Sequence, residues 1–295
     1  MIDLSVVIPT YNRLDTLRHV IPALLDQTVV RERYEIIVAD SRSTDGTGEY
    51  LATVAREAGN VRHLPGAYTG RAAARNAGIA AAQGRVVLFN DSDIIASRDL
   101  LERHLARHDE MRCAVVGLEV QVRSYDEYVA KSASPPRRDT LHPPARKRLT
   151  WLYFLTGNAS VGREDLDAAG RFDETFTGYG HEDLELGYRL EARGVPIVYE
   201  SRAVSYHLQD VGFEDQKAKM ELAGRSTVRF YRKHPDFVVK LRLGMTPVSL
   251  GAHTVLERLP AVRDWLERRS ATSPLAKNIA YQYHYVSGIK AALRE

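Results

Sequence analysis

Strand and helix patterns alternate over the first 90 residues, and this alternation restricts the fold more than any other feature. Short apolar runs that predict buried strands occupy residues 4–8, 34–39, 61–64 and 85–89. The segments between them, at residues 15–25, 47–58 and 70–83, are amphipathic or alanine-rich and predict helices. Strands that alternate with helices pair in parallel, with helices on both faces of the sheet. The chain therefore predicts an α/β fold with a mostly parallel central sheet.

Polar residues follow three of these strands at the point where each strand ends. Pro9 and Thr10 close the first strand, Asp40 closes the second, and Asp91-Ser92-Asp93 follows the fourth. In sheets of this kind ligands bind outside the carboxyl ends of the strands. An Asp-x-Asp pair at a strand end can also hold a hard divalent cation against a diphosphate. We therefore expect a nucleotide site at this edge of the sheet.

A second carboxylate motif, Glu182-Asp183, opens a helical pattern that runs to about residue 193. A carboxylate at a loop-to-helix junction can take a proton from an attacking hydroxyl. The alternative is a structural role, because acidic side chains in the first turn favour the helix dipole. Together the two carboxylate motifs predict metal-assisted group transfer from a nucleotide-activated donor.

After residue 93 the chain continues with strand and helix patterns, and beyond residue 213 it shows helical patterns alone. A helix is expected over residues 98–110 and a helix over 183–193, and strands are expected in the segments 114–123, 159–161, 195–199 and 204–207. Residues 132–149 are rich in Pro, Arg and Lys and predict a loop that closes over a donor, meets an anionic acceptor or is simply solvated. Beyond residue 213, helices are expected over 217–234, 248–267 and 273–293, with breaks at Pro247, Pro260 and Pro274. We expect a catalytic domain over 1–212, with a nucleotide half (1–123) and an acceptor half (150–212), and a helical extension over 213–295.

Composition excludes several classes of protein. The net charge of +3 is small and the arginines are scattered, which argues against nucleic acid as the main partner. The one cysteine, Cys113, lies in an apolar run, so we expect a buried thiol, no intrachain disulfide and no cysteine-based zinc site. No leader pattern and no apolar run of membrane-spanning length is present, which predicts a cytoplasmic protein. The basic helix at 217–234 is either a solvated face or a peripheral contact with the inner face of a membrane.

The motifs, taken in order, resemble the inverting GT-A-fold glycosyltransferases of family 2. The first four are Val-Val-Ile-Pro-Thr-Tyr-Asn-Arg (6–13), Ile-Ile-Val-Ala-Asp-Ser-Arg-Ser-Thr-Asp-Gly-Thr (36–47), Ala-Arg-Asn-Ala-Gly (74–78) and Leu-Phe-Asn-Asp-Ser-Asp (88–93). The segments 157–164, 170–176 and 178–190 resemble the C-terminal half of galactosyl- and N-acetylgalactosaminyltransferases. The resemblance covers roughly residues 2–210 and implies a Rossmann-like GT-A domain.

The resemblance also implies roles for the carboxylates. Asp93 would bind the Mn²⁺ or Mg²⁺ that bridges the donor diphosphate, and Asp91 would contact the ribose or the metal through water. His207 would be a second protein ligand, which favours Mn²⁺, or else a hydrogen-bonded histidine. Asp183 would be the general base and Glu182 would bind the acceptor or donor sugar, although these two roles are interchangeable.

The nucleotide-sugar pocket would draw residues from all of these motifs. The expected lining residues are Pro9, Thr10, Tyr11, Arg13, Asp40, Arg71, Arg75, Asn76, Asp91, Trp151, Gly157 and Asn158. Three have a plain structural alternative: Asp40 as a turn cap, Arg75 as a surface residue of its helix, and Trp151 as a core side chain. Ser41 and Arg42 depart from the family pattern after the second strand, so the nucleobase preference stays open.

The expected function is metal-dependent, inverting transfer of a hexose or N-acetylhexosamine from a UDP-sugar to an acceptor hydroxyl. The motifs favour galactose or N-acetylgalactosamine, and the acceptor is open between glycan, lipid carrier, peptide and small natural product. The first alternative is a non-catalytic nucleotide-sugar-binding or scaffold protein, which the intact set of Asp91, Asp93, Asp183 and His207 disfavours. The second is a sugar nucleotidyltransferase, which would normally carry glycines where this chain has residues 9–13.

Overall fold

The computed structural model describes residues 1–134 and 148–295, which form two compact units. The first unit contains residues 1–177 and 182–210, and the second contains residues 178–181 and 211–295. Most of the loop expected over 132–149 lies outside the described residues.

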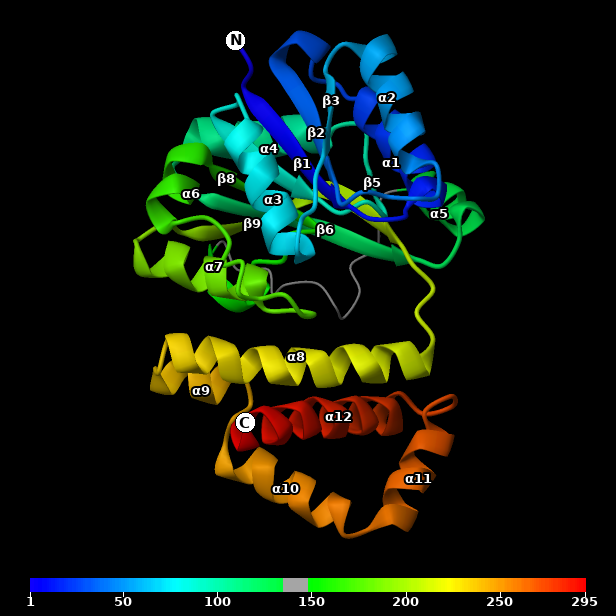
Figure 1. Ribbon diagram of the computed structural model, residues 1–295, viewed down its shortest axis with the longest axis vertical. Helices are drawn as coiled ribbons and strands as arrows, with labels where there is room; N and C mark the ends of the chain where they lie inside the picture. The colour runs from blue at the N-terminus through cyan, green and yellow to red at the C-terminus, as the bar shows by residue number, and fades with distance from the viewer. Residues whose placement is uncertain (135–147) are drawn as a thin grey trace. The chain divides into compact units, whose positions relative to one another are not determined.

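Four parallel strands form one half of the sheet in the first unit (Figure 1). They are β1 (Leu4–Thr10), β2 (Tyr34–Asp40), β3 (Val61–Pro65) and β4 (Val86–Asn90), in the spatial order β3-β2-β1-β4. The crossovers are α1 (Leu14–Leu25), α2 (Thr47–Ala58) and α3 (Gly70–Ala81). Val6 and Ile8 of β1 share a core with α1, whereas Val7 faces Gly78 of α3. Because neighbouring residues of a strand point to opposite faces, the helices cover both faces, as predicted.

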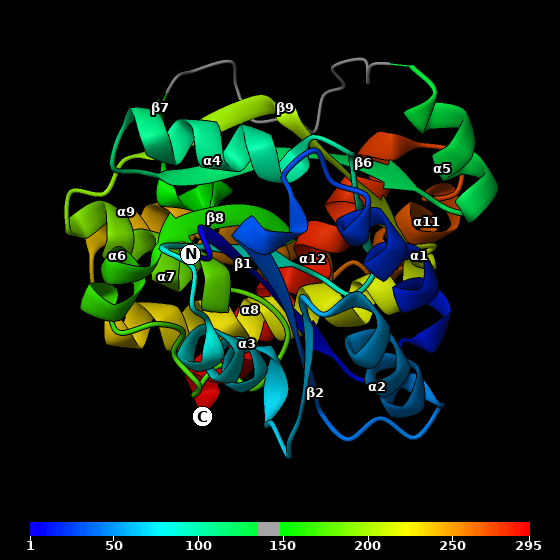
Figure 2. The same ribbon diagram turned by 90° about the horizontal axis from the view of Figure 1, so that it is seen from above.

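The other half of the sheet is built largely from antiparallel pairs. Its strands are β5 (Ile94–Ala96), β6 (Ala114–Val122), β7 (Arg148–Leu149), β8 (Asn158–Gly162) and β9 (Ile197–Leu208). β8 runs antiparallel to both β4 and β6, so the sheet is mixed, and the expectation of a mostly parallel sheet holds best for the first four strands. Figure 2 shows β6, β8 and β9 of this half from above. The two strands expected at 195–199 and 204–207 are one strand, β9, which runs parallel to β6 with an irregularity at Gly117/Leu118.

The remaining helices of the first unit pack around this half. They are α4 (Leu100–Glu110), α5 (Tyr125–Ser132), α6 (Arg163–Ala169) and α7 (Glu182–Ala192), with short 3₁₀ turns at Arg31–Arg33 and Trp151–Tyr153. Cys113 is buried with Val115 and Val198, and burial raises the pKa of its thiol to about 11. The prediction of a buried cysteine is therefore confirmed.

The second unit is helical. Its helices are α8 (Phe213–Lys233), α9 (Phe237–Arg242), α10 (Pro247–Glu257), α11 (Pro260–Arg269) and α12 (Pro274–Arg294). The helix expected over 248–267 is interrupted at Pro260, which begins α11, as the proline pattern predicted. The backbones of α8 and α12 come into contact at Gly288 of α12. A Cβ on Gly288 would lie 2.0 Å from the carbonyl oxygen of Glu221 in α8. Across the described chain, none of the helices combines the length and apolar character needed to cross a bilayer.

Candidate active site

The Asp-x-Asp motif forms the turn between β4 and β5. The amide of Asn90 holds this turn, because its Nδ2 donates hydrogen bonds to the carbonyl oxygens of Asp91 (2.8 Å) and Ile94 (2.9 Å). β5 then pairs antiparallel with β9, with Ile94 opposite His207. This register brings the residue before β5, Asp93, beside His207.

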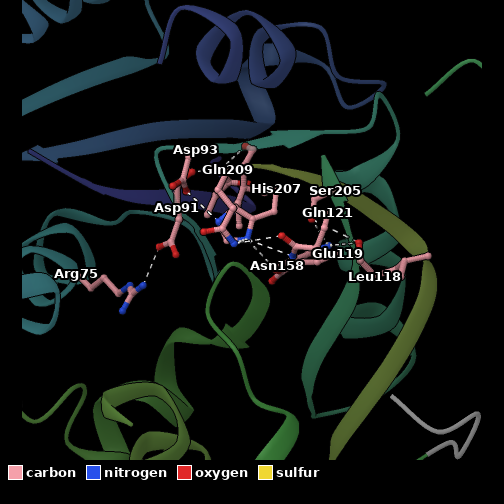
Figure 3. A network of polar contacts seen from close by, with 12 residues as sticks. Arg75, Asp91, Asp93, Leu118, Glu119, Gln121, Asn158, Ser205, His207 and Gln209 are labelled. Carbon is pink, nitrogen blue, oxygen red and sulfur yellow. Dashed lines mark hydrogen bonds and ion pairs between the residues drawn. The ribbon is translucent and has the colours of Figure 1, made fainter. Parts of the chain in front are cut away.

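Asp93 and His207 form a charged pair at the edge of the sheet (Figure 3). The Nε2 of His207 lies 3.5 Å from Oδ1 of Asp93, and the Nδ1 lies 3.6 Å from Oε2 of Glu119. Burial lowers the pKa of His207, but Asp93 and Glu119 outweigh it and raise that pKa to about 10. Burial raises the pKa of Asp93, yet the contact with His207 leaves it below its usual value. The carboxylates of Asp93 and Glu119 therefore favour a positive charge between them.

The two carboxylate motifs are joined by one buried arginine. Arg75 of α3 is 1% exposed, and its Nη2 donates to Oδ1 of Asp91 at 2.8 Å while its Nη1 donates to Oε1 of Glu182 at 2.9 Å. The guanidinium carbon also lies 5.4 Å from the centre of the Phe172 ring. From the sequence, Arg75 is expected in the nucleotide-sugar pocket, with a surface position on its helix as the alternative. The structure buries Arg75 between Asp91 and Glu182, so the surface alternative does not hold.

Asp183 lies in the first turn of α7, directly after Glu182. One carboxylate oxygen accepts a hydrogen bond from the backbone N–H of Leu184 at 2.8 Å. Burial, followed by the charge of Glu182, raises the pKa of Asp183 to about 7, although Arg75 opposes the shift. A carboxylate with a pKa near neutrality is suited to accept a proton from a hydroxyl.

Residues at the ends of β1 and β2 line the same edge of the sheet. Thr10 is 5% exposed, and its buried hydroxyl has no hydrogen-bond partner among the described residues. Tyr11 and Arg13 follow with exposed side chains, and Arg71 is exposed at the start of α3. Pro9 pairs with Ala39 inside the sheet. The exposed side chains are the groups here that a donor can reach.

Asp40 holds a turn. Its Oδ1 accepts hydrogen bonds from the N–H (3.0 Å) and the hydroxyl (2.6 Å) of Ser43, and its Oδ2 lies 3.2 Å from Nε2 of His63. Asp40 is only 2% exposed, so the structural alternative considered for it, a turn cap, is the arrangement observed. The turn presents Arg42, which is exposed and has a φ of 58°.

Three residues expected in the sugar pocket make contacts within the fold. Asn158 is 1% exposed, and its Nδ2 donates to the carbonyl oxygens of Leu118 and Ala203, at the irregularity between β6 and β9. The amide of Asn76 holds the backbone of Phe172. Trp151 is 4% exposed and packs edge-on against Tyr188, as a core residue does.

Gly157 makes room for a residue that the sequence did not single out. A Cβ at Gly157 would lie 2.5 Å from Oε1 of Glu119, so a larger residue here would require that carboxylate to shift. Glu119 carries no motif of its own. Its position depends on the pairing of β6 with β9, which no local pattern reveals.

The donors at Asp93 and His207 fit a divalent cation. Within residues 1–134 and 148–295, no cluster of three or more His, Cys, Asp or Glu side chains is arranged to hold a metal. The observed set is thus one carboxylate and one imidazole, which leaves other coordination positions to phosphate oxygens or water, as Mn²⁺ and Mg²⁺ usually require.

The sequence profile of glycosyl transferase family 2 matches residues 5–170. Validoxylamine A glucosyltransferases from two subspecies of Streptomyces hygroscopicus, jinggangensis and limoneus, are each 29% identical to the chain over an alignment of 284 residues, which covers 87% of the chain. The chain spans 67% and 62% of the length of these relatives. Among solved structures, the mannosyltransferase PcManGT of Pyrobaculum calidifontis, in complex with GDP-Man and Mn²⁺, has a TM-score of 0.69 at 19% identity, over 98% of this chain and 86% of that one. S. aureus TarS 1–349 in complex with UDP has a TM-score of 0.61 at 20% identity, over 99% and 92%.

Proposed function

Because the chain belongs to glycosyl transferase family 2, we propose that it transfers a hexose or N-acetylhexosamine from a UDP-sugar to an acceptor hydroxyl with inversion at the anomeric carbon. The observation that carries this proposal is the pair of hydrogen bonds that Arg75 donates to Asp91 and Glu182. These bonds link the Asp-x-Asp turn to the helix that begins with Glu182 and Asp183. A leaving-group site and a base site therefore flank a single centre, as a single displacement requires.

Asp93 and His207 would hold the divalent cation. When bound, the cation neutralises charge on the departing diphosphate. Asp91 is turned to Arg75 by their hydrogen bond, so we assign it to the donor side of the site and not to the metal.

Asp183 receives the proton of the acceptor hydroxyl. The acceptor oxygen forms a bond to the anomeric carbon while the bond from that carbon to the diphosphate breaks, and UDP leaves. Glu182 is 4% exposed and hydrogen bonded to Arg75, so the more exposed Asp183 is the better base. Arg75 keeps the pKa of Asp183 from rising further, which maintains part of the carboxylate in its basic form at neutral pH.

Several donors need to be compared. The names of the relatives point to glucose, the motifs at 157–190 favour galactose or N-acetylgalactosamine, and the structural neighbours carry UDP, UDP-GlcNAc or GDP-Man. We take UDP as the nucleotide because the segments 157–164, 170–176 and 178–190 resemble galactosyl- and N-acetylgalactosaminyltransferases.

A donor panel tests the proposal. Release of UDP from UDP-Glc, UDP-Gal, UDP-GlcNAc and UDP-GalNAc, and of GDP from GDP-Man, is measured with Mn²⁺ and with a chelator. We expect slow Mn²⁺-dependent hydrolysis of one UDP-sugar, and its loss in Asp93→Ala. Hydrolysis of GDP-Man alone would contradict the UDP assignment, and inertness towards all five donors would contradict the proposed reaction.

A further inference from the structure

The environment of His207 contains a second carboxylate that the proposed reaction does not use. Glu119 lies on β6 and His207 on β9, which run parallel with Glu119 opposite Ser205 and Gln121 opposite His207. Leu118 and Val122 of β6, and Val204 and Tyr206 of β9, point into the hydrophobic core. Because side chains alternate along a strand, Glu119 and His207 lie together on the opposite face.

Glu119 contacts the edge of the imidazole that faces away from Asp93. Its Oε2 is 3.6 Å from Nδ1, whereas Oδ1 of Asp93 is 3.5 Å from Nε2 (Figure 3). The amide Nε2 atoms of Gln121 and Gln209 also lie near Nδ1, at 3.4 Å and 3.3 Å. All of these groups belong to the first unit of the chain.

We propose that Glu119 is a positioning residue for the metal site: it holds the ring of His207 through Nδ1, so that Nε2 faces the cation bound by Asp93. A histidine that binds a metal through one nitrogen commonly donates its other N–H to a carboxylate, which fixes the tautomer and the ring orientation. This inference rests on the proposed metal dependence, since it concerns the same cation.

The chain reserves space for this carboxylate. Glu119 is 22% exposed, and Oε1 would lie 2.5 Å from a Cβ placed on Gly157. The same Cβ would lie 2.5 Å from Cδ1 of Ile94, so an added side chain would displace the tips of both neighbouring side chains. Gly157→Ala should therefore shift Glu119 and disturb the metal site without removing any ligand.

Mn²⁺ binding tests the proposal. Affinity is measured on the full chain by the electron paramagnetic resonance signal of free Mn²⁺, with and without UDP. Glu119→Gln preserves the shape of the side chain but removes its charge, and we expect it to weaken Mn²⁺ binding about 10- to 100-fold. Glu127→Gln, the same change on α5 where Glu127 pairs with Lys131, is the matched control and should bind Mn²⁺ like the wild type.

A double variant separates positioning from direct ligation. If Glu119 acts through His207, Glu119→Gln has no further effect in a His207→Ala background, and Gly157→Ala weakens binding in the wild type but not in that background. Unchanged affinity in Glu119→Gln, or an equal further loss in the His207→Ala background, would overturn the proposal. If Asp93→Ala and His207→Ala themselves bind Mn²⁺ like the wild type, it is the proposed metal site that fails.

Discussion

Replacement of Arg75 by methionine should destabilise the first unit strongly. The guanidinium is 1% exposed and hydrogen bonded to a buried carboxylate, Glu182, whose second oxygen has no hydrogen-bond partner among the described residues. Removing one member of a buried ion pair leaves an uncompensated charge, at a cost of about 3–5 kcal/mol. The loss of the contact with Asp91 adds little to this cost, because the Asp91 side chain is 25% exposed and can regain hydrogen bonds to water.

A second substitution, Glu182→Met, tests whether the loss of stability comes from the pair of Arg75 and Glu182. Replacing both partners by apolar side chains of similar length removes the uncompensated charge. We therefore expect Arg75→Met/Glu182→Met to be more stable than Arg75→Met alone by about 2 kcal/mol or more. The matched control is Arg103→Met, which breaks a partly exposed pair with Asp99, the residue before α4, and should cost less than about 1 kcal/mol.

Urea unfolding followed by tryptophan fluorescence measures these differences. The chain has two tryptophans, of which Trp151 is buried in the first unit and Trp265 is half exposed in the second. In a Trp265→Phe background, Trp151 alone reports on the unit that contains Arg75. A loss below about 1 kcal/mol in Arg75→Met, or a double variant no more stable than the single one, would refute the buried-pair reasoning.

Three further predictions concern the base and the helical unit. Asp183→Asn should lower kcat about 10²- to 10⁴-fold while Mn²⁺ and UDP binding stay unchanged, and weakened UDP binding would argue against a role as base. Because the base must be ionised and its pKa is about 7, kcat should fall as pH drops below 7; a pH–rate profile flat from pH 5 to 8 would contradict this. Gly288→Ala should destabilise the second unit by about 1–3 kcal/mol in urea, since the added Cβ meets a backbone carbonyl. Gly251→Ala, in α10 with open space around it, should instead stabilise by up to about 1 kcal/mol, and equal effects of the two would count against the close helix contact.

The sequence predicts the parallel half of the sheet well. The patterns that indicate β1–β4 and their crossover helices lie within single short segments, so each element can be recognised without knowledge of distant contacts. The same logic places Thr10, Asp40 and Asp91 at one edge, because parallel strands end on the same side. Family membership and the GT-A fold class, both expected from motif order, are confirmed by the family 2 match and the structural neighbours.

The contacts that assemble the site are not predictable in this way. Arg75 and Glu182 are 107 positions apart, and nothing in the periodicity of either segment indicates that they meet. Glu119 faces His207 because an irregularity at Gly117/Leu118 sets the register of β6 against β9. Asn158 is expected in the sugar pocket from its place before the second carboxylate motif, and its amide donates hydrogen bonds to the backbone carbonyls at that irregularity.

In the proposed reaction, Asp93 serves donor binding through the cation while Asp183 serves as the base. The most direct test is to measure donor binding and donor hydrolysis in parallel. Wild type, Asp93→Ala and Asp183→Asn are each titrated with the preferred UDP-sugar in Mn²⁺ and in chelator, and UDP release is followed in the same samples. We predict that Asp93→Ala loses the Mn²⁺-dependent part of donor binding, whereas Asp183→Asn binds the donor normally but does not turn it over. Donor binding that is independent of both Mn²⁺ and Asp93, or full turnover in Asp183→Asn, would contradict the account.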